Sequence, residues 1–66
     1  MVKYETDIDT IFYALSDKTR RDILKRALES EHTISALTKY YDMSFVAVAK
    51  HINVLTKANL LVKFKV

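Results

Sequence analysis

The stretch that decides the fold is residues 33–59, TISALTKYYDMSFVAVAKHINVLTKAN. It is expected to form a short helix that opens at Thr33, a bend at residues 42–43 and a longer helix that opens at Ser44. Serine and threonine are favoured immediately before a helix because their hydroxyls accept a hydrogen bond from a free backbone amide. This pattern predicts a helix-turn-helix, the motif whose second helix can enter the major groove of DNA.

The longer helix has two faces of different character. Val48, Ile52 and Leu55 recur at the spacing of a buried helical stripe. The opposite face carries Phe45, Val46, Ala47, Lys50, Asn53 and Lys57. Apolar groups suit the methyl groups of thymine, and Lys50 could donate to guanine or to a phosphate. We therefore predict that this outer face contacts DNA; the alternative is that Phe45 packs back onto the protein.

Two amphipathic helices are expected ahead of this segment. The first would open at Thr6 and carry on one face Ile8, Ile11, Phe12 and Leu15. The second would open at Ser16 or Asp17 and carry an apolar stripe made of Ile23, Leu24, Ala27 and Leu28. Its Arg20 or Arg21 could reach a phosphate, although such arginines more often pair with an acid or stay solvated.

The C-terminal residues 62–66, VKFKV, alternate strictly between apolar and basic side chains. This period of two predicts a half-buried β-strand, which needs a pairing partner because lone strands are unstable. Asn59 before it tolerates the left-handed backbone that ends helices. The expected fold class is mainly α, with about four helices plus a short C-terminal β-strand, in a single domain over residues 1–66.

Positive charge is concentrated in the C-terminal part of the chain. Residues 1–42 contain seven Lys and Arg against eight Asp and Glu, a balance of −1, whereas residues 43–66 contain four Lys and no acid, a balance of +4. A basic surface of this kind is the electrostatic footprint of a protein that binds a polyanion. A solvated basic face would also fit four lysines, but their coincidence with the helix-turn-helix pattern favours double-stranded DNA as the partner.

Composition excludes several functions. The chain has no Cys, and His32 and His51 lie in different predicted elements, so no metal and no cofactor are expected. It has no Gly for a phosphate-cradling loop and no nucleophile with a base at a suitable spacing, so an enzyme is not expected. No apolar run reaches ~18 residues and the N-terminus carries no apolar stretch, which predicts neither a membrane span nor a secretory signal and makes a cytoplasmic location the default.

Three segments together carry a resemblance to a known family. They are IFYALSDKTRRDIL at residues 11–24, TISALTKYYDMSFVAVAKHINVL at 33–55 and KANLLVK at 57–63. Their order and spacing resemble the ArsR-type winged helix-turn-helix repressors, which typically have ALSDPTRxxIL followed by VxELAxxxxxSxxAVSKHLxVLxxAGLV. The resemblance implies a reading helix packed on three others and followed by a β-wing. It also implies a homodimer that binds its operator and represses transcription until an inducer intervenes.

The resemblance assigns candidate DNA-binding residues by position. They are Ser44, Phe45, Val46, Lys50 and His51 on the reading helix, with Thr33, Ser35 and Tyr40 near the DNA backbone. The chain departs from the pattern at Ala49, where a serine is common, and at Lys18 and Asn59, which replace Pro and Gly. The family pattern continues into a second wing strand and a C-terminal helix that residues 1–66 do not include, so the module is expected to be partial.

An alternative function is a winged helix that binds another protein. In that case Phe45, Val46 and the strand at residues 62–66 would form an apolar patch for a partner chain. Ala49 and the partial wing favour this alternative, because both weaken the expected contacts to DNA. Association that is insensitive to salt would distinguish it from DNA binding, whose affinity falls as the salt concentration rises.

Overall fold

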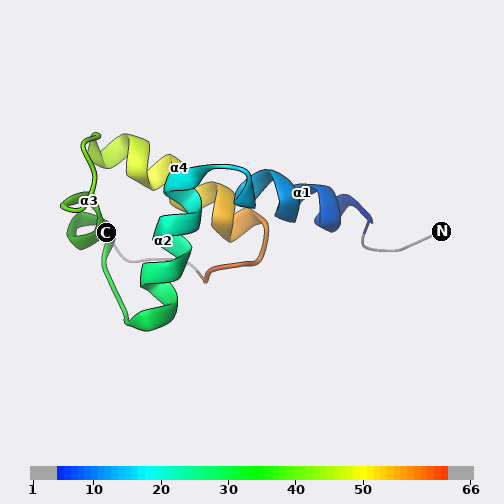
Figure 1. Ribbon diagram of the computed structural model, residues 1–66, viewed down its shortest axis with the longest axis horizontal. Helices are drawn as coiled ribbons and strands as arrows, with labels where there is room; N and C mark the ends of the chain where they lie inside the picture. The colour runs from blue at the N-terminus through cyan, green and yellow to red at the C-terminus, as the bar shows by residue number, and fades with distance from the viewer. Residues whose placement is uncertain (1–4, 63–66) are drawn as a thin grey trace.

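The helix-turn-helix is part of a small helical assembly. The computed structural model describes the backbone of residues 5–62 and the side chains of residues 8–62. Within that range the chain forms α1 (Glu5–Leu15), α2 (Lys18–Glu29), α3 (Ile34–Thr38) and α4 (Phe45–Lys57). α4 contacts the other three helices, α2 crosses it, and α1 extends toward one end of the molecule (Figure 1). The β-strand predicted at residues 62–66 lies outside the described residues except for its first residue.

Capping side chains set the start of the later helices, as predicted. Asp17, Thr33 and Ser44 precede α2, α3 and α4, and each accepts a hydrogen bond from the backbone N–H three residues later, at 2.9, 3.1 and 3.1 Å. Asn59, with φ at 60°, takes the predicted left-handed conformation just after α4. The N–H of the following residue, Leu60, then reaches back to a carbonyl of the last turn at 3.0 Å. This is the hydrogen bond of a Schellman motif, which ends the helix without a glycine.

The hydrophobic core is centred on α4. Its predicted inner stripe of Val48, Ile52 and Leu55 is buried, with exposed fractions of 0, 3 and 0%. The other buried apolar residues are Ala14, Ile23, Leu37 and Ala58, so every helix places a side chain in the core. Burial of apolar surface, at roughly 25 cal/mol per Å², therefore holds α4 by one side only. The opposite side of α4, which carries Val46 and Lys50, is exposed.

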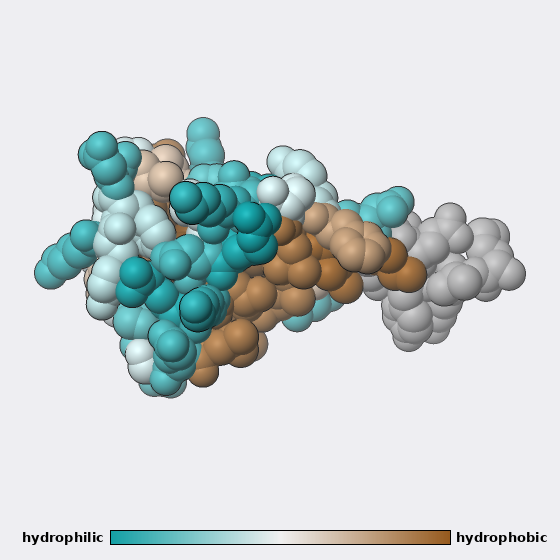
Figure 2. Space-filling view, in the orientation of Figure 1, coloured by the Kyte–Doolittle hydropathy of each residue, from teal (hydrophilic) through white to brown (hydrophobic). Residues whose placement is uncertain are grey.

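α1 buries only part of the stripe that its sequence predicts: Ile11 packs partly buried against the core, and Leu15 is partly buried. Ala14 is its buried residue, whereas Ile8 and Phe12 are 46 and 69% exposed. The first turns of α1 project toward one end of the molecule, away from α2 (Figure 1). Figure 2 shows an apolar surface that runs from the lower middle of the molecule toward that end. Because α1 already begins at Glu5, the prediction that Thr6 precedes and caps this helix is wrong.

Candidate nucleic-acid interface

The outer face of α4 is open to solvent. Val46 is 60% exposed, and Lys50, four residues on, is exposed on the same side of the helix. Phe45 is 37% exposed in the first turn and, seven residues before Ile52, lies nearer the core stripe than the outer face predicted for it. Asn53 and Lys57 continue this face toward the C-terminal end, and both are exposed. Phe45 thus keeps more than a third of its surface in solvent instead of packing fully onto the protein. Since the core stripe lies on the opposite side, this face can enter a groove without any rearrangement of the core.

The residues predicted to approach the DNA backbone lie around α3. Thr33 and Ser35 are exposed, and the Thr33 hydroxyl forms the cap of α3. Tyr40, just after α3, is 53% exposed. Its ring is held by the Arg26 guanidinium, whose carbon is 3.8 Å from the ring centroid, and by the edge of His32, with ring centroids 6.2 Å apart. These two contacts restrict the orientation of the Tyr40 ring, whose other side is exposed.

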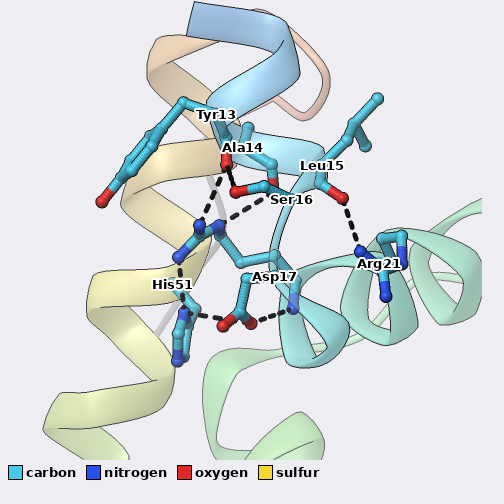
Figure 3. Close-up of polar contacts among 8 residues, drawn as sticks. Tyr13, Ala14, Leu15, Ser16, Asp17, Arg21 and His51 are labelled. Atoms are coloured by element: carbon cyan, nitrogen blue, oxygen red, sulfur yellow. Dashed lines mark hydrogen bonds and ion pairs between the residues drawn. The ribbon is translucent and has the colours of Figure 1, made fainter.

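His51 lies on the flank of α4 and turns toward the corner between α1 and α2 (Figure 3). Its Nδ1 is 3.2 Å from Nη1 of Arg20 and 3.9 Å from Oδ2 of Asp17. The His51 side chain is 24% exposed. Unlike the side chains of the outer face, it is half-buried and joined to another helix.

Arg20 is a buried charge at the same corner, with an exposed fraction of 7%. Its Nε donates to the Ala14 carbonyl at 2.9 Å, and its Nη2 donates to the Tyr13 carbonyl at 3.0 Å. These carbonyls belong to the last turn of α1, where the helical hydrogen bonds of the backbone run out and a partial negative charge gathers. The Tyr13 carbonyl also accepts the backbone N–H of Ser16 at 3.2 Å. Of the outcomes expected for Arg20 or Arg21, a phosphate contact and a solvated side chain are both wrong for Arg20, because its guanidinium is bound inside the fold, whereas Arg21 is exposed.

The residues around Arg20 complete a structural corner. Arg21 donates from Nη1 to the Leu15 carbonyl at 2.8 Å, and the Ser16 hydroxyl donates to the Tyr13 carbonyl at 2.6 Å. The backbone N–H of Arg20 lowers the pKa of Asp17, which caps the next helix, and burial opposes this effect. The segment LSDKTRR, part of the family-like pattern, thus ends α1 and starts α2. Two arginines three and four residues after the helix cap Asp17 are the sequence signal from which this corner could have been predicted.

A second polar cluster joins α2 to the turn before α4. The Tyr41 hydroxyl donates to Oδ2 of Asp22 at 2.6 Å, and Nε of Arg26 donates to the same oxygen at 2.9 Å. The Tyr41 hydroxyl, followed by Arg26, lowers the pKa of Asp22. Burial, followed by the hydrogen bond to Asp22, raises the pKa of Tyr41 to about 12. The cluster connects the turn before Ser44 to α2, and it therefore helps to set the direction of α4.

Alkaline titration is expected to reveal Tyr41 as a tyrosine that ionises late. Its pKa is about 12 in the folded protein, against 10.0 for an unperturbed tyrosine. Because the folded-state pKa is the higher one, the stabilisation is complete below pH 10.0 and is lost as the pH rises toward about 12. Ultraviolet absorbance of tyrosinate measures the titration, with circular dichroism confirming that the protein stays folded. Tyr41→Phe should remove the late step and Tyr13→Phe should keep it; a wild-type titration without a late step contradicts the assignment.

An open groove of about 580 Å³ lies between α2 and the same turn. Lys18, Arg21 and Lys25 line its α2 side, and Tyr40 and Tyr41 line the other. Two acidic side chains share the lining and offset part of this charge. The charge balance along the sequence did not reveal these cations, because the acids of residues 1–42 cancel them in the sum, whereas in the groove Asp22 and Asp42 offset them only in part.

The histidines of the chain lie apart from each other. Nε2 of His32 is 3.0 Å from the Ser30 hydroxyl in the loop after α2, whereas His51 is at the corner between α1 and α2. Among the described side chains, no group of three or more His, Asp or Glu residues is placed to hold a metal ion. Within residues 5–62, no helix has the length and apolar character needed to cross a membrane.

The capped turn between α3 and α4, the buried stripe of α4 and its exposed outer face define a helix-turn-helix protein. No protein-family model matches the chain, and no curated protein matches it. A solved structure does match: the crystal structure of an ArsR family transcriptional regulator, with a TM-score of 0.79 and 38% sequence identity over 88% of this chain and 60% of that chain. This match confirms the resemblance to the ArsR-type winged helix-turn-helix family and the mainly α fold class. The chain spans 60% of the length of that regulator.

Proposed function

We propose that this chain is a DNA-binding transcriptional regulator, that it acts as a repressor, and that α4 reads the major groove of its operator. The observation that carries the proposal is the outer face of α4, where Val46 and Lys50 are exposed on a helix anchored from its other side, with Phe45 partly exposed in its first turn. The matching structure is that of a transcriptional regulator, which supports DNA binding as the activity. The protein would act in the cytoplasm, where a repressor meets its operator, without a metal or a cofactor.

Each part of the interface has a role in this proposal. The first turn of α4 enters the groove, where Phe45 and Val46 meet thymine methyl groups and Lys50 donates to a guanine. Ser44 marks the helix N-terminus, whose partial positive charge favours a nearby phosphate. Tyr40 and the first turn of α3 approach the sugar-phosphate backbone and set the register of the protein on the duplex. Occupation of the operator would then exclude the transcription machinery.

Binding to duplex DNA is the direct test of this function. Fluorescence anisotropy with a labelled duplex of random sequence at low salt should show binding whose affinity falls as salt is added. The reason is that lysine and arginine side chains of the protein displace counterions from the phosphates. Selection from a library of random duplexes would then supply an operator. The proposal fails if no duplex binds at any salt concentration.

Lys50→Ala is expected to weaken binding to the selected operator by about 1–3 kcal/mol, the discrimination carried by one good base contact. Lys57→Ala is the matched control, because it removes the same charge from the same face at the far end of α4. The control should weaken binding equally on all sequences, as expected of a phosphate contact. Anisotropy titrations on operator and random duplex compare the two variants. An equal loss on both duplexes for Lys50→Ala would assign Lys50 to phosphate instead.

The proposed regulator is a homodimer that associates through α1. Ile8 and Phe12 expose an apolar surface at one end of the molecule, and helix faces of this kind are commonly covered by a partner. Phe12→Glu is expected to weaken dimerisation by on the order of 2 kcal/mol or more, because it buries a charge in an apolar contact. Light scattering over a range of concentrations measures the effect. Leu28→Glu changes a leucine that is 77% exposed on α2 and should leave the dimer intact; an unchanged dimer in Phe12→Glu contradicts the proposed interface.

A protein-binding winged helix is the second candidate function. The exposure of Val46 at 60% favours it, because an apolar side chain in that position also suits a partner protein. Phe45 and the strand predicted at residues 62–66 would belong to the same patch. In this case Val46→Asp would abolish association with the partner protein at high and low salt alike. The protein would then not bind DNA, and the anisotropy titration described above tests this.

A further inference from the structure

The contact between Arg20 and His51 determines which nitrogen of the neutral histidine ring carries the proton. A guanidinium group has only donors, so it cannot accept a hydrogen bond from an imidazole N–H. Nη1 of Arg20 lies 3.2 Å from Nδ1 of His51, within hydrogen-bond reach. Nδ1 must therefore accept this bond, and the proton of the neutral ring must be on Nε2.

Asp17 is the group that would favour the opposite tautomer, and it is badly placed to do so. Its Oδ2 is 3.9 Å from Nδ1 of His51, beyond hydrogen-bond distance. The same oxygen already accepts the backbone N–H of Arg20 at 2.9 Å, as the cap of α2. A proton on Nδ1 would thus face a guanidinium donor and gain no hydrogen bond, only the weaker attraction of the Asp17 carboxylate at 3.9 Å.

Arg20 is itself held too firmly to turn away. It is 7% exposed, and two carbonyls of the last turn of α1 bind its Nε and Nη2 at 2.9 and 3.0 Å. The aromatic ring of Tyr13 lies 4.9 Å from its guanidinium carbon. These contacts leave Nη1 directed at α4, so the corner between α1 and α2 determines which nitrogen of His51 carries the proton.

The free nitrogen of His51 points away from this corner. Figure 3 shows one ring nitrogen turned toward Asp17 and the other turned away from it. Lys50 on the outer face and Ile52 in the core are the sequence neighbours of His51, each about 100° around the helix. His51 therefore lies on the flank of α4. When a helix lies in the major groove, its flanks face the sugar-phosphate walls, whose oxygens are acceptors.

We propose that Arg20 is a positioning residue that holds His51 as the neutral Nε2–H tautomer, and that this N–H donates to a phosphate oxygen beside the reading helix. The phosphate contact rests on the DNA binding proposed above, whereas the tautomer of His51 does not. A neutral donor adds no cation to the interface. The contact therefore strengthens binding without adding to the salt dependence, in contrast to a lysine–phosphate contact.

The tautomer is tested without DNA. A long-range ¹H–¹⁵N correlation spectrum at a pH where the ring is neutral identifies the protonated nitrogen of His51, with His32→Gln used to assign the signals. The expected result is Nε2–H in the wild type and a mixture of both tautomers in Arg20→Met. A wild-type ring protonated on Nδ1, or an Arg20→Met ring with no mixture, overturns the proposal. If Arg20→Met does not fold, the wild-type spectrum alone decides.

The phosphate contact is tested with two variants of His51. In His51→Asn the amide can still accept from Arg20 near the place of Nδ1, but no donor remains near Nε2; His51→Gln supplies an amide N–H there. We expect His51→Asn to lose about three- to tenfold in affinity for every duplex, as for one hydrogen bond, with an unchanged salt slope. His51→Gln should stay closer to wild type.

Three outcomes would overturn the contact: wild-type affinity in His51→Asn, a loss confined to particular sequences, or a salt slope that falls with the affinity. A wild-type protein that binds no DNA at all would instead refute the proposed function. The NMR spectrum would still test the role of Arg20 in that case. Failure of the tautomer or the phosphate contact can therefore be distinguished from failure of the proposed DNA binding.

Discussion

Leu55→Ala is expected to lower the free energy of unfolding by about 2–5 kcal/mol. Leu55 is fully buried in the stripe by which α4 joins the core. Its truncation loses the transfer free energy of the removed methyl groups and leaves a cavity that the surrounding helices fill only in part. A domain of this size rarely has more than about 3–5 kcal/mol of stability from its core. The variant should therefore be largely unfolded at room temperature and lose DNA binding, although Leu55 lies opposite the outer face.

Urea unfolding followed by circular dichroism measures this loss. The protein concentration must be fixed, because dimerisation would make the apparent stability depend on it. Leu28→Ala is the matched control, since Leu28 is 77% exposed on α2. It should change the stability by no more than about 0.5 kcal/mol. A loss below about 1 kcal/mol in Leu55→Ala, far under the usual range for a buried leucine, would mean that α4 is not anchored by this stripe.

The features that the sequence predicts correctly are local ones. Thr33 and Ser44 cap their helices through an amide only three residues away, and Asn59 bends the chain by its own backbone preference. The stripe of Val48 and Leu55 follows from helical periodicity within one element. Each prediction needs information from a single turn or a single helix, which is why it holds without knowledge of the tertiary structure.

The features that the sequence does not predict depend on contacts between distant residues. Arg20 binds partners six, seven and 31 positions away, and Tyr41 binds Asp22 across 19 positions. The exposure of Phe12 has the same origin, because an apolar stripe on α1 does not say which element will cover it. The DNA-binding residues were assigned by position in a family pattern and stay a prediction. What the structure adds is that His51 is tied to another helix.

Arg20→Met is expected to lower the free energy of unfolding by about 2–4 kcal/mol. Methionine can replace part of the aliphatic stem but none of the donors. The carbonyls of Tyr13 and Ala14 then lose charge-assisted hydrogen bonds, which contribute about 1.5–3 kcal/mol each. The loss is smaller than the sum because the variant no longer buries a charge, and desolvation of that charge opposes folding in the wild type. Thermal and urea unfolding at fixed protein concentration measure the difference.

Arg21→Met is the matched comparison, because the neighbouring arginine also binds a carbonyl at the end of α1. Its hydrogen bond to Leu15 is exposed, so water can replace it and the cost should stay near or below about 0.5 kcal/mol. Equal losses in the two variants would mean that charge near the helix end, rather than the buried geometry of Arg20, stabilises the corner. A large difference would show that the corner orients α1 and α2 through one side chain. That side chain also reaches His51 on the reading helix, so a loss of stability at the corner should extend to the surface proposed to meet DNA.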